Sequence, residues 1–454
     1  MGNPHVLVIP YPSQGHVIPM MKLSQCLVKQ GCRITFVNTE YNHKQLMNAS
    51  AMKDGTGNGI RLVSVSDVLE SSEERKQPEK VMKAIMQVMP QKVEELIDQV
   101  NESDDEEIAC VLADYNVGWA LEIADKKGIR RAAFRPNAAT LMVLVLSIQK
   151  LIGDGIIDKD GTPTKKQMIK LSPNMPAMNT ADFMWTCTGN MNLQKTIFKN
   201  TITNTRAMKL TNWLLCNSAY DLEPAAFTMA PEILPIGPIF AGNPPGDSAG
   251  NFWAEDFTCL KWLDQQPPQS VIYVAFGSST FLEQTQFHEL ALGLELSNRP
   301  FLWVVRPGIT YAVDDAYPKG FRHRVGGRGK IVDWAPQLKI LDHPSVACFI
   351  IHCGWNSTMA ALSKGGPLLC WNYIVDQFHN ESYICDTWKV GLRLNRDERG
   401  IITPEEIKTK VEELVGNGKY SASALGLKEL VMSSIKEGGS SYNNLMNFIL
   451  WLKS

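Results

Sequence analysis

The chain has 454 residues, of which 44% are hydrophobic and 20% are charged, and its formal net charge is −2. This length exceeds what one ordinary hydrophobic core supports, so we expect at least two domains. Because 45 Lys and Arg nearly balance 47 Asp and Glu, the composition argues against a nucleic-acid binder and favours small neutral partners.

The ten cysteines are scattered through apolar stretches without any Cys-x-x-Cys pair, which is typical of reduced thiols in a cytosolic core. The N-terminus runs directly into a strand-like segment, so we expect no signal peptide. No later apolar run reaches the length of a membrane span. We therefore expect a cytoplasmic monomer without stable membrane insertion.

The first half of the chain alternates short apolar runs with helix-length amphipathic stretches, the pattern of a parallel sheet covered by helices. Strands are predicted at residues 5–9 (HVLVI), 33–37 (RITFV) and 108–113 (IACVLA). A helix is predicted over residues 19–30, ending before Gly31, and another around residues 119–127.

A stretch rich in Pro, Gly, Asn and Ser follows Gly237 and separates two periodic regions. The alternation then restarts, with predicted strands at residues 270–276, 301–305, 331–332, 347–351 and 367–371. We expect an α/β protein with two Rossmann-like, doubly wound domains, at residues 1–240 and 259–434, joined by a linker at 241–258. The helical and apolar segment 435–454 is able to pack back on the first domain.

Two polar residues of the first half follow strands, where ligands bind in open parallel sheets. His16 is expected in the loop between the first strand and its helix, and Asp114 comes directly after a later strand. A carboxylate on one imidazole nitrogen fixes the tautomer, so that the other nitrogen can take a proton from a hydroxyl. The alternative is that both residues only cap helices.

The second half contains three further polar segments that follow strands. Ser278 lies in the segment FGSST, and residues 352–357 (HCGWNS) offer an imidazole, a hydroxyl and the amides of a helix start, which suit a diphosphate. Asp376 and Gln377 add a carboxylate and an amide suited to sugar hydroxyls. Taken singly, each segment is also compatible with helix capping.

The region from Trp334 to Gln377 resembles the signature box of plant family 1 UDP-glycosyltransferases. The resemblance lies in the spacing of its WAPQ, HCGWNS and DQ elements. It extends over essentially the whole chain, through the starting PYPSQGH, the LAD that ends at Asp114, the strand YVAFGS and the late turn EGGSS.

The resemblance implies a GT-B fold, in which an N-terminal acceptor domain and a C-terminal UDP-sugar domain face each other across a cleft. It implies that His16 is the catalytic base and Asp114 its partner. Trp334 would stack on the uracil, with Ala335 and Gln337 contacting the base and ribose. The phosphates would be held by Ser278, His352, Asn356 and Ser357. Trp355, Asp376 and Gln377 would contact the sugar, with Gln377 accompanying a preference for glucose.

The chain departs from the family pattern at Ala360, where the family carries a Glu that hydrogen-bonds the ribose hydroxyls. Losing such charge-assisted bonds should cost about 1.5 to 3 kcal/mol of donor binding, or on the order of ten- to a hundredfold in affinity. Gly366, where Val is usual, and Asn372, where Pro is usual, are further departures.

We therefore expect the transfer of a sugar, most readily glucose, from a UDP-sugar to a hydroxyl of a small lipophilic acceptor such as a flavonoid, phenol or terpenoid. The configuration at the anomeric carbon is expected to invert. UDP-glucose or another UDP-sugar is the co-substrate, and no cofactor or metal is expected. Acceptor contacts are expected in residues 41–89 and 141–204.

Three alternatives remain open. One is a nucleotide-sugar-binding protein catalytically weakened by Ala360. A scaffold protein is another. The third is a nicotinamide-dependent oxidoreductase, which the absence of G-x-G-x-x-G after the first strand disfavours.

Overall fold

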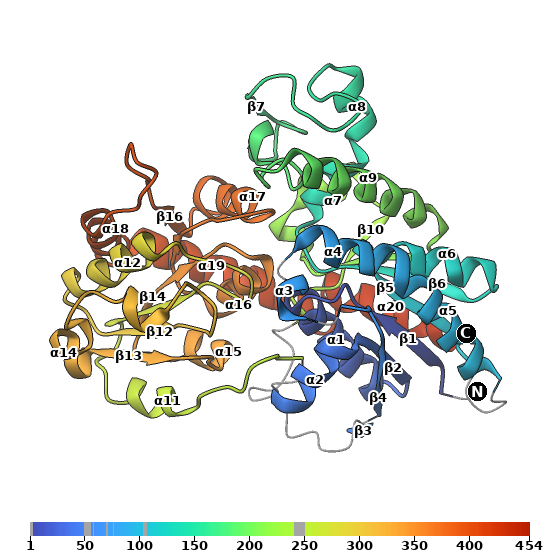
Figure 1. The fold of residues 1–454 in the computed structure, drawn as a ribbon, viewed down its shortest axis with the longest axis horizontal. Helices are drawn as coiled ribbons and strands as arrows, with labels where there is room; N and C mark the ends of the chain where they lie inside the picture. The colour runs from blue at the N-terminus through green and yellow to red at the C-terminus, as the bar shows by residue number, and fades with distance from the viewer. Residues whose placement is uncertain are drawn as a thin grey trace.

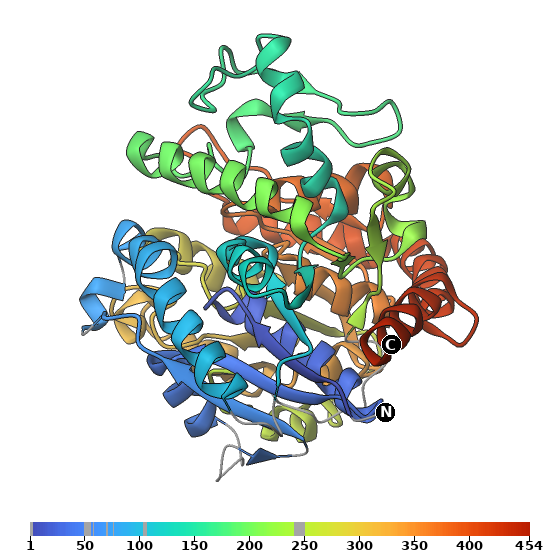
Figure 2. The same cartoon turned by 90° about the vertical axis from the view of Figure 1, so that its right-hand side faces the viewer.

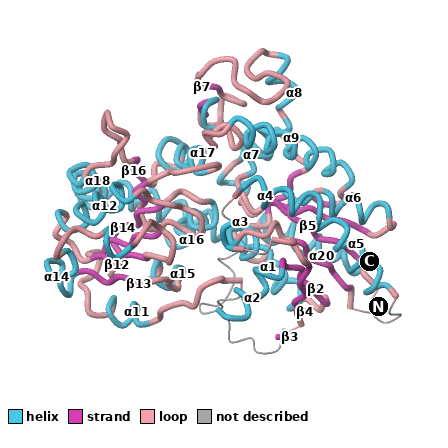
Figure 3. Tube along the Cα trace, viewed as in Figure 1, coloured by secondary structure: helices cyan, strands magenta, loops and turns pink. Residues whose placement is uncertain are grey.

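The computed structural model describes residues 3–49, 56–57, 59–69, 71–75, 77–102, 107–239 and 250–454. Residues 241–249 of the expected linker lie outside the described residues. The described residues form two groups of strands, each covered by helices. Figure 3 shows the strands in magenta and the helices in cyan.

The first sheet has eight strands among the described residues, in the order β10-β9-β6-β5-β1-β2-β4-β3. All neighbours pair in parallel except the short β3, which is antiparallel to β4. The strands are β1 (His5–Ile9), β2 (Arg33–Thr39), β3 (Thr56–Gly57), β4 (Ile60–Val65), β5 (Cys110–Asp114), β6 (Arg130–Arg135), β9 (Trp213–Cys216) and β10 (Ile233–Pro235).

Both faces of this sheet are buried, which explains why its strands are continuous apolar runs rather than alternating ones. In β1, Leu7 and Ile9 belong to one core cluster, whereas Val6 and Val8 belong to another on the opposite face. The helices described in this half are α1 (Gln14–Lys29), α2 (Glu40–Ala49), α3 (Ser72–Arg75), α4 (Pro78–Lys83), α5 (Met89–Asn101), α6 (Trp119–Lys126), α7 (Ala139–Leu146), α8 (Ile148–Gly153), α9 (Met191–Ala207) and α10 (Pro224–Met229). A small hairpin of β7 (Met168–Ile169) and β8 (Met178–Asn179) lies with α8 above them (Figure 1).

The second sheet is entirely parallel, with the order β13-β12-β11-β14-β15-β16 in the part of the chain that is described. Its strands are β11 (Val271–Ala275), β12 (Phe301–Val304), β13 (Gly329–Val332), β14 (Val346–Ile351), β15 (Leu368–Cys370) and β16 (Gly391–Arg393). Its helices are α11 (Thr258–Leu263), α12 (Gln284–Leu296), α13 (Val313–Ala316), α14 (Phe321–Val325), α15 (Gln337–Leu341), α16 (Trp355–Lys364), α17 (Gln377–Ser382), α18 (Pro404–Gly416) and α19 (Gly418–Ile435). These data confirm the predicted α/β class with two parallel sheets.

Each sheet reverses its strand order at one point, and ligands bind beyond the carboxyl ends of the strands there. In the first sheet the point lies between β1 and β5, which pair directly. In the second it lies between β11 and β14. The segments that follow β1, β11 and β14 contain His16, Ser278 and His352, and Asp114 is the last residue of β5 rather than the first residue after it. Topology alone thus places these residues at the two switch points.

The last helix, α20 (Ser440–Lys453), crosses back and packs against the first sheet (Figure 2). Phe448 lies in the core cluster of that half, with its ring 5.6 Å from the ring of Trp213. Arg130 donates to the carbonyls of Trp451 and Leu452 at 2.7 and 2.8 Å, which satisfies acceptors at the end of the helix.

Candidate active site

A cavity of about 380 Å³ lies between the two halves of the chain. Its walls come from α1 and the loop after β6 on one side, and from the segments after β11, β13, β14 and β15 on the other. All the predicted site residues line it except Asp114, which is buried and bonded to His16. The predicted residues on the cavity wall are His16, Ser278, Trp334, Ala335, Gln337, His352, Trp355, Asn356, Ser357, Ala360, Asp376 and Gln377.

His16 and Asp114 form a hydrogen-bonded pair. The Nδ1 atom of His16 lies 2.7 Å from Oδ2 of Asp114, whose side chain is fully buried, whereas the imidazole is 17% exposed. The other carboxylate oxygen accepts from the amide of Asn116 at 2.8 Å, so Asp114 also caps the following turn. Burial, aided by the negative charge of Asp114, raises the pKa of the adjacent Tyr11 to about 12. With the carboxylate on Nδ1, the Nε2 atom of His16 is the nitrogen able to accept a proton.

Helix α1 begins one turn earlier than expected, at Gln14 rather than Pro19. His16 therefore lies in the first helical turn and not in a loop. A proline has no backbone N–H, so Pro19 leaves the carbonyl of Gly15 without its usual partner four residues on. Asn356 of the second half donates its Nδ2 to this carbonyl at 2.5 Å. This bond joins the helix that contains His16 to the helix α16 across the cavity.

The imidazole of His352 lies between two glycines. A Cβ built on Gly277, whose φ is +66°, would lie 2.6 Å from Nε2 of His352, and a Cβ on Gly354 would also overlap this atom. Burial, with a smaller effect of the Arg306 charge, lowers the pKa of His352 to about 4. A hydrogen bond with the backbone of Ala275 opposes this lowering. The ring is therefore neutral at pH 7 and carries a single N–H.

The start of α16 presents groups that suit an anion. Gly354 is the N-cap of this ten-residue helix, and the first-turn residues Asn356 and Ser357 line the cavity. The free amides of a helix start carry partial positive charge. Two lysines from opposite halves, Lys22 and Lys339, also line the wall. This part of the cavity can hold a diphosphate.

Aromatic and amide groups form another part of the wall. The ring of Trp334 lies 4.9 Å from the ring of Trp253, at an angle of 33°. Gln337 donates from Nε2 to the hydroxyl of Ser357 at 3.1 Å, and its Oε1 lies 3.5 Å from the hydroxyl of Tyr273. Gln337 is thereby oriented from both sides. The flat indole of Trp334 can stack on a base, and the oriented amide of Gln337 can form hydrogen bonds, so this wall suits a nucleoside.

Ala335 and Ala360 contribute only methyl groups and backbone to this wall, and both are buried. Ala360 lies one turn after Ser357 on α16, so its side chain occupies the same side of the helix. It offers no hydrogen-bonding group to a ligand.

Asp376 lies where the two halves meet, close to His16. Its Oδ2 accepts from Asn380 at 2.9 Å and, across the halves, from Asn137 at 3.4 Å. Burial raises the pKa of Asp376, an effect that these two hydrogen bonds and the charge of His16 oppose. The carboxylate is thus held close to the His16 side of the cavity.

The side chain of Gln377 fixes the loop that precedes it. Its Oε1 accepts from the amides of Tyr373 and Ile374 at 2.7 and 3.0 Å, so its Nε2 is the atom that can donate to a ligand. Val375 has a φ of +57°, which is unusual for a β-branched residue, and its amide donates to the sulfur of Cys187 at 3.2 Å. A contact from the first half thus holds this loop.

Trp355 lines the cavity, but its indole N–H is used elsewhere. Nε1 donates to the carbonyl of Asn217 at 2.7 Å, and the side chain is buried. Trp388 makes an equivalent bond to the carbonyl of Leu222 at 3.0 Å. These two indoles join the second half to the segment after β9. The sequence motif predicted the position of Trp355 on the wall but not this role.

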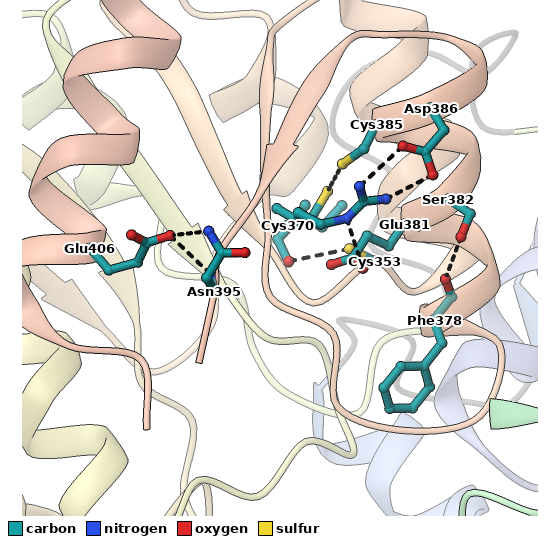
Figure 4. Close-up of polar contacts among 11 residues, drawn as sticks. Cys353, Cys370, Phe378, Glu381, Ser382, Cys385, Asp386, Asn395 and Glu406 are labelled. Carbon is teal, nitrogen blue, oxygen red and sulfur yellow. Dashed lines mark hydrogen bonds and ion pairs between the residues drawn. The ribbon is translucent and has the colours of Figure 1, made fainter. Parts of the chain in front are cut away.

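Three cysteines, Cys353, Cys370 and Cys385, lie together in the second half (Figure 4). The sulfurs of Cys370 and Cys385 are 3.8 Å apart, and all ten cysteines of the chain are free thiols. Burial raises the pKa of Cys353 and Cys370, which keeps these thiols neutral. Arg393 pairs with Glu381 at the edge of the same cluster, and the region serves as packing beneath the site.

Several cavity residues were not predicted. Gln14, Lys22 and Asn137 line the wall from the first half. Asn137 follows β6, so recognising that strand would have identified it. Asn251 and Glu255 also line the wall, although they belong to the segment expected to be a linker. Its local composition carries no signal for a binding role.

Within the ranges that the structure describes, no group of three or more His, Cys, Asp or Glu side chains is arranged to hold a metal ion. The helices of the described part are also too short or too polar to cross a membrane.

Comparison with known proteins places this geometry in context. The model of the family "UDP-glucoronosyl and UDP-glucosyl transferase" matches residues 4–434. UDP-glycosyltransferase 83A1 of Arabidopsis thaliana is 47% identical, over 100% of this chain and 98% of that protein. Linamarin synthase 1 of Manihot esculenta is 31% identical, over 98% of this chain and 96% of its own length.

Two solved structures extend the likeness to the fold. Os79 from O. sativa, in complex with UDP, has a TM-score of 0.81 and 25% identity, covering 98% of this chain and all of that one. A UDP-glucosyltransferase from Polygonum tinctorium capable of glucosylating indoxyl has a TM-score of 0.82 and 26% identity, with both chains fully covered. Together with the two parallel sheets, these matches confirm the predicted GT-B fold.

Proposed function

Since the chain belongs to the UDP-glucoronosyl and UDP-glucosyl transferase family and is a UDP-glycosyltransferase, we propose that it transfers glucose from UDP-glucose to a hydroxyl of a small lipophilic acceptor, with inversion at the anomeric carbon. The observation that carries this proposal is the pair His16–Asp114, whose imidazole lines the same cavity as the helix start of α16.

In the proposed reaction, Nε2 of His16 takes the proton of the acceptor hydroxyl while that oxygen attacks the anomeric carbon. The bond between this carbon and the β-phosphate oxygen breaks, and its electron pair leaves with UDP. Asp114 stabilises the imidazolium that forms. The charge on UDP would be met by the amides of α16, by Ser278 and by the N–H of His352.

We assign the nucleoside to the wall formed by Trp334 and Gln337, with the indole stacked on uracil and Ala335 contacting the base. Asn356 and Ser357 contribute to the phosphate site, and Trp355 would contact the sugar through its backbone because its indole N–H is engaged. Asp376 and the Nε2 of Gln377 would bind the sugar hydroxyls.

These assignments give each half of the chain its own role. Residues 1–240 would form the acceptor domain and residues 259–434 the UDP-sugar domain, with 241–258 between them and 435–454 attached to the first. The acceptor class is supported by relatives such as a 7-deoxyloganetin glucosyltransferase of Catharanthus roseus and by a Phytolacca americana structure in complex with pterostilbene. UDP-glucose would be needed as co-substrate, and the protein would act in the cytoplasm.

The test is turnover of UDP-glucose with a panel of phenols, flavonoids and terpenoid alcohols, followed by mass spectrometry of products and NMR of the anomeric proton. We expect a β-glucoside, and we expect His16→Ala to lower kcat by about 10²- to 10⁴-fold. The exposed His323 provides the control, since His323→Ala should leave kcat unchanged. An α-linked product, or a His16→Ala variant as active as the control, would contradict the proposal.

A further inference from the structure

The segment expected to be a linker is part of the cavity wall. Asn251 and Glu255 line the cavity, and Trp253 packs its ring against that of Trp334 at 4.9 Å. The amide of Asp256 donates to the carbonyl of Trp334 at 2.9 Å. These contacts fasten the segment to the proposed nucleoside end and hold Glu255 at a defined place beside it.

The carboxylate of Glu255 is oriented by a hydrogen bond and lies on the same part of the wall as the side-chain amide of Gln337. Its Oε1 accepts from Nδ2 of Asn251 at 3.0 Å. The pKa of Tyr273 is raised mainly by burial, and the negative charges of the nearby Cys259 and Glu255 add to this effect. The hydroxyl of Tyr273 lies 3.5 Å from Oε1 of Gln337. Glu255 is therefore on the side of the cavity where Gln337 would meet the ribose.

Among the described residues that line the cavity, two carry carboxylates, Glu255 and Asp376. Asp376 is bonded to Asn137 and lies close to His16, at the end proposed for the sugar. On α16 the hydroxyl of Ser357 accepts from Gln337, and Ala360, three residues further on, offers only a methyl group. A ribose presents two adjacent hydroxyls, and a carboxylate can accept from both with charge-assisted hydrogen bonds.

We propose that Glu255 is the residue that binds the ribose hydroxyls of the UDP-sugar, an inference that rests on the proposed function. The carboxylate comes from the segment between the two sheets rather than from α16. Ala360 then leaves the donor site complete, because the group absent from the helix is supplied from the opposite wall.

The test is calorimetric titration of the full chain with UDP and with 2′-deoxy-UDP, which lacks one ribose hydroxyl. The wild type should bind UDP about ten- to a hundredfold more tightly than 2′-deoxy-UDP. Glu255→Gln should weaken UDP binding and bring the ratio of the two affinities close to one. Glu255→Asp, which keeps the charge but withdraws it by one methylene, should also lose most of this ratio.

Two further variants complete the design. Ala360→Glu in the Glu255→Gln background should restore the preference for UDP, since it returns a carboxylate to the same end of the cavity. The exposed Glu398 provides the control, and Glu398→Gln should retain the wild-type ratio. Thermal unfolding of each variant verifies that the fold persists.

Each contrary result has a distinct meaning. If Glu255→Gln weakens both ligands by the same factor, Glu255 does not distinguish the ribose hydroxyls, and the inference is overturned. If the ratio does not change at all, it is overturned as well. If the wild type binds neither ligand, the proposed function fails and this inference fails with it.

Discussion

Replacing Asp114 with Asn separates the two roles that its position allows. An Asn side chain has the same shape, and its carbonyl can still accept from the amide of Asn116, as Oδ1 does now at 2.8 Å. Its NH₂ group, however, would replace the carboxylate oxygen that lies 2.7 Å from Nδ1 of His16. His16 must then accept at Nδ1 and carry its proton on Nε2, where it cannot take one from an acceptor hydroxyl.

We therefore expect Asp114→Asn to lower kcat/KM by about 10²- to 10⁴-fold, equivalent to about 2.7 to 5.4 kcal/mol of transition-state stabilisation. Its melting temperature should stay close to that of the wild type because the cap at Asn116 persists. Initial rates with UDP-glucose and a saturating phenol, together with a thermal unfolding curve, measure both quantities. If Asp114 only caps its turn, the variant keeps its activity, and the dyad is refuted.

Two other perturbations test the site and its surroundings. Gly354→Ala should lower UDP affinity about tenfold or more, because the added Cβ overlaps the imidazole of His352. Gly366→Ala is the control and should keep the wild-type affinity, since a Cβ there meets no atom within 4 Å. Equal UDP affinities of the two variants, measured by calorimetry, would contradict the predicted displacement of His352. Burial lowers the pKa of His379 to about 4, so the folded state holds this ring neutral while the unfolded chain takes up a proton below about pH 6.5. The contribution of His379 to stability is therefore present above pH 6.5 and lost as the pH falls toward 4, by at most about 3 kcal/mol. The free energy of unfolding in urea, measured at pH 7.5 and 4.5, should fall less for His379→Phe than for the wild type, whereas His323→Gln should show the wild-type loss. The same loss in both variants would show that His379 is not responsible.

The parts of the site that follow strands could be predicted from the sequence because parallel topology places them. The run HVLVI is apolar throughout since β1 is buried on both faces, and its bounds in the structure are those predicted. The motif HCGWNS was expected between a strand and a helix, and it runs from the end of β14 into the first turn of α16. In such sheets the order of strands and helices is enough to bring chain-distant residues to one edge.

Other features depend on contacts that local sequence does not encode. The indole of Trp355 bonds to the carbonyl of Asn217, a backbone group 138 positions away in the chain. Asn251 and Glu255 lie in a stretch whose polar composition is typical of a connector. They line the cavity only because the fold brings this stretch beside α1 and the second sheet. The helical spacing of Met20, Leu23 and Leu27 predicts a helix only from Pro19, whereas α1 begins at Gln14.

The proline in α1 also explains how the two halves can work as one site. Because Pro19 has no N–H to give, the carbonyl of Gly15 can bond instead to Asn356, at 2.5 Å. Gly15 precedes the proposed base, His16, and Asn356 lies in the first turn of the proposed phosphate-binding helix. This hydrogen bond is therefore one of several contacts between the halves, with Asn137–Asp376 and Trp355–Asn217 among them, that set the position of His16 relative to α16. An unbroken helix in α1 would satisfy that carbonyl internally and leave the base without this link to the second half.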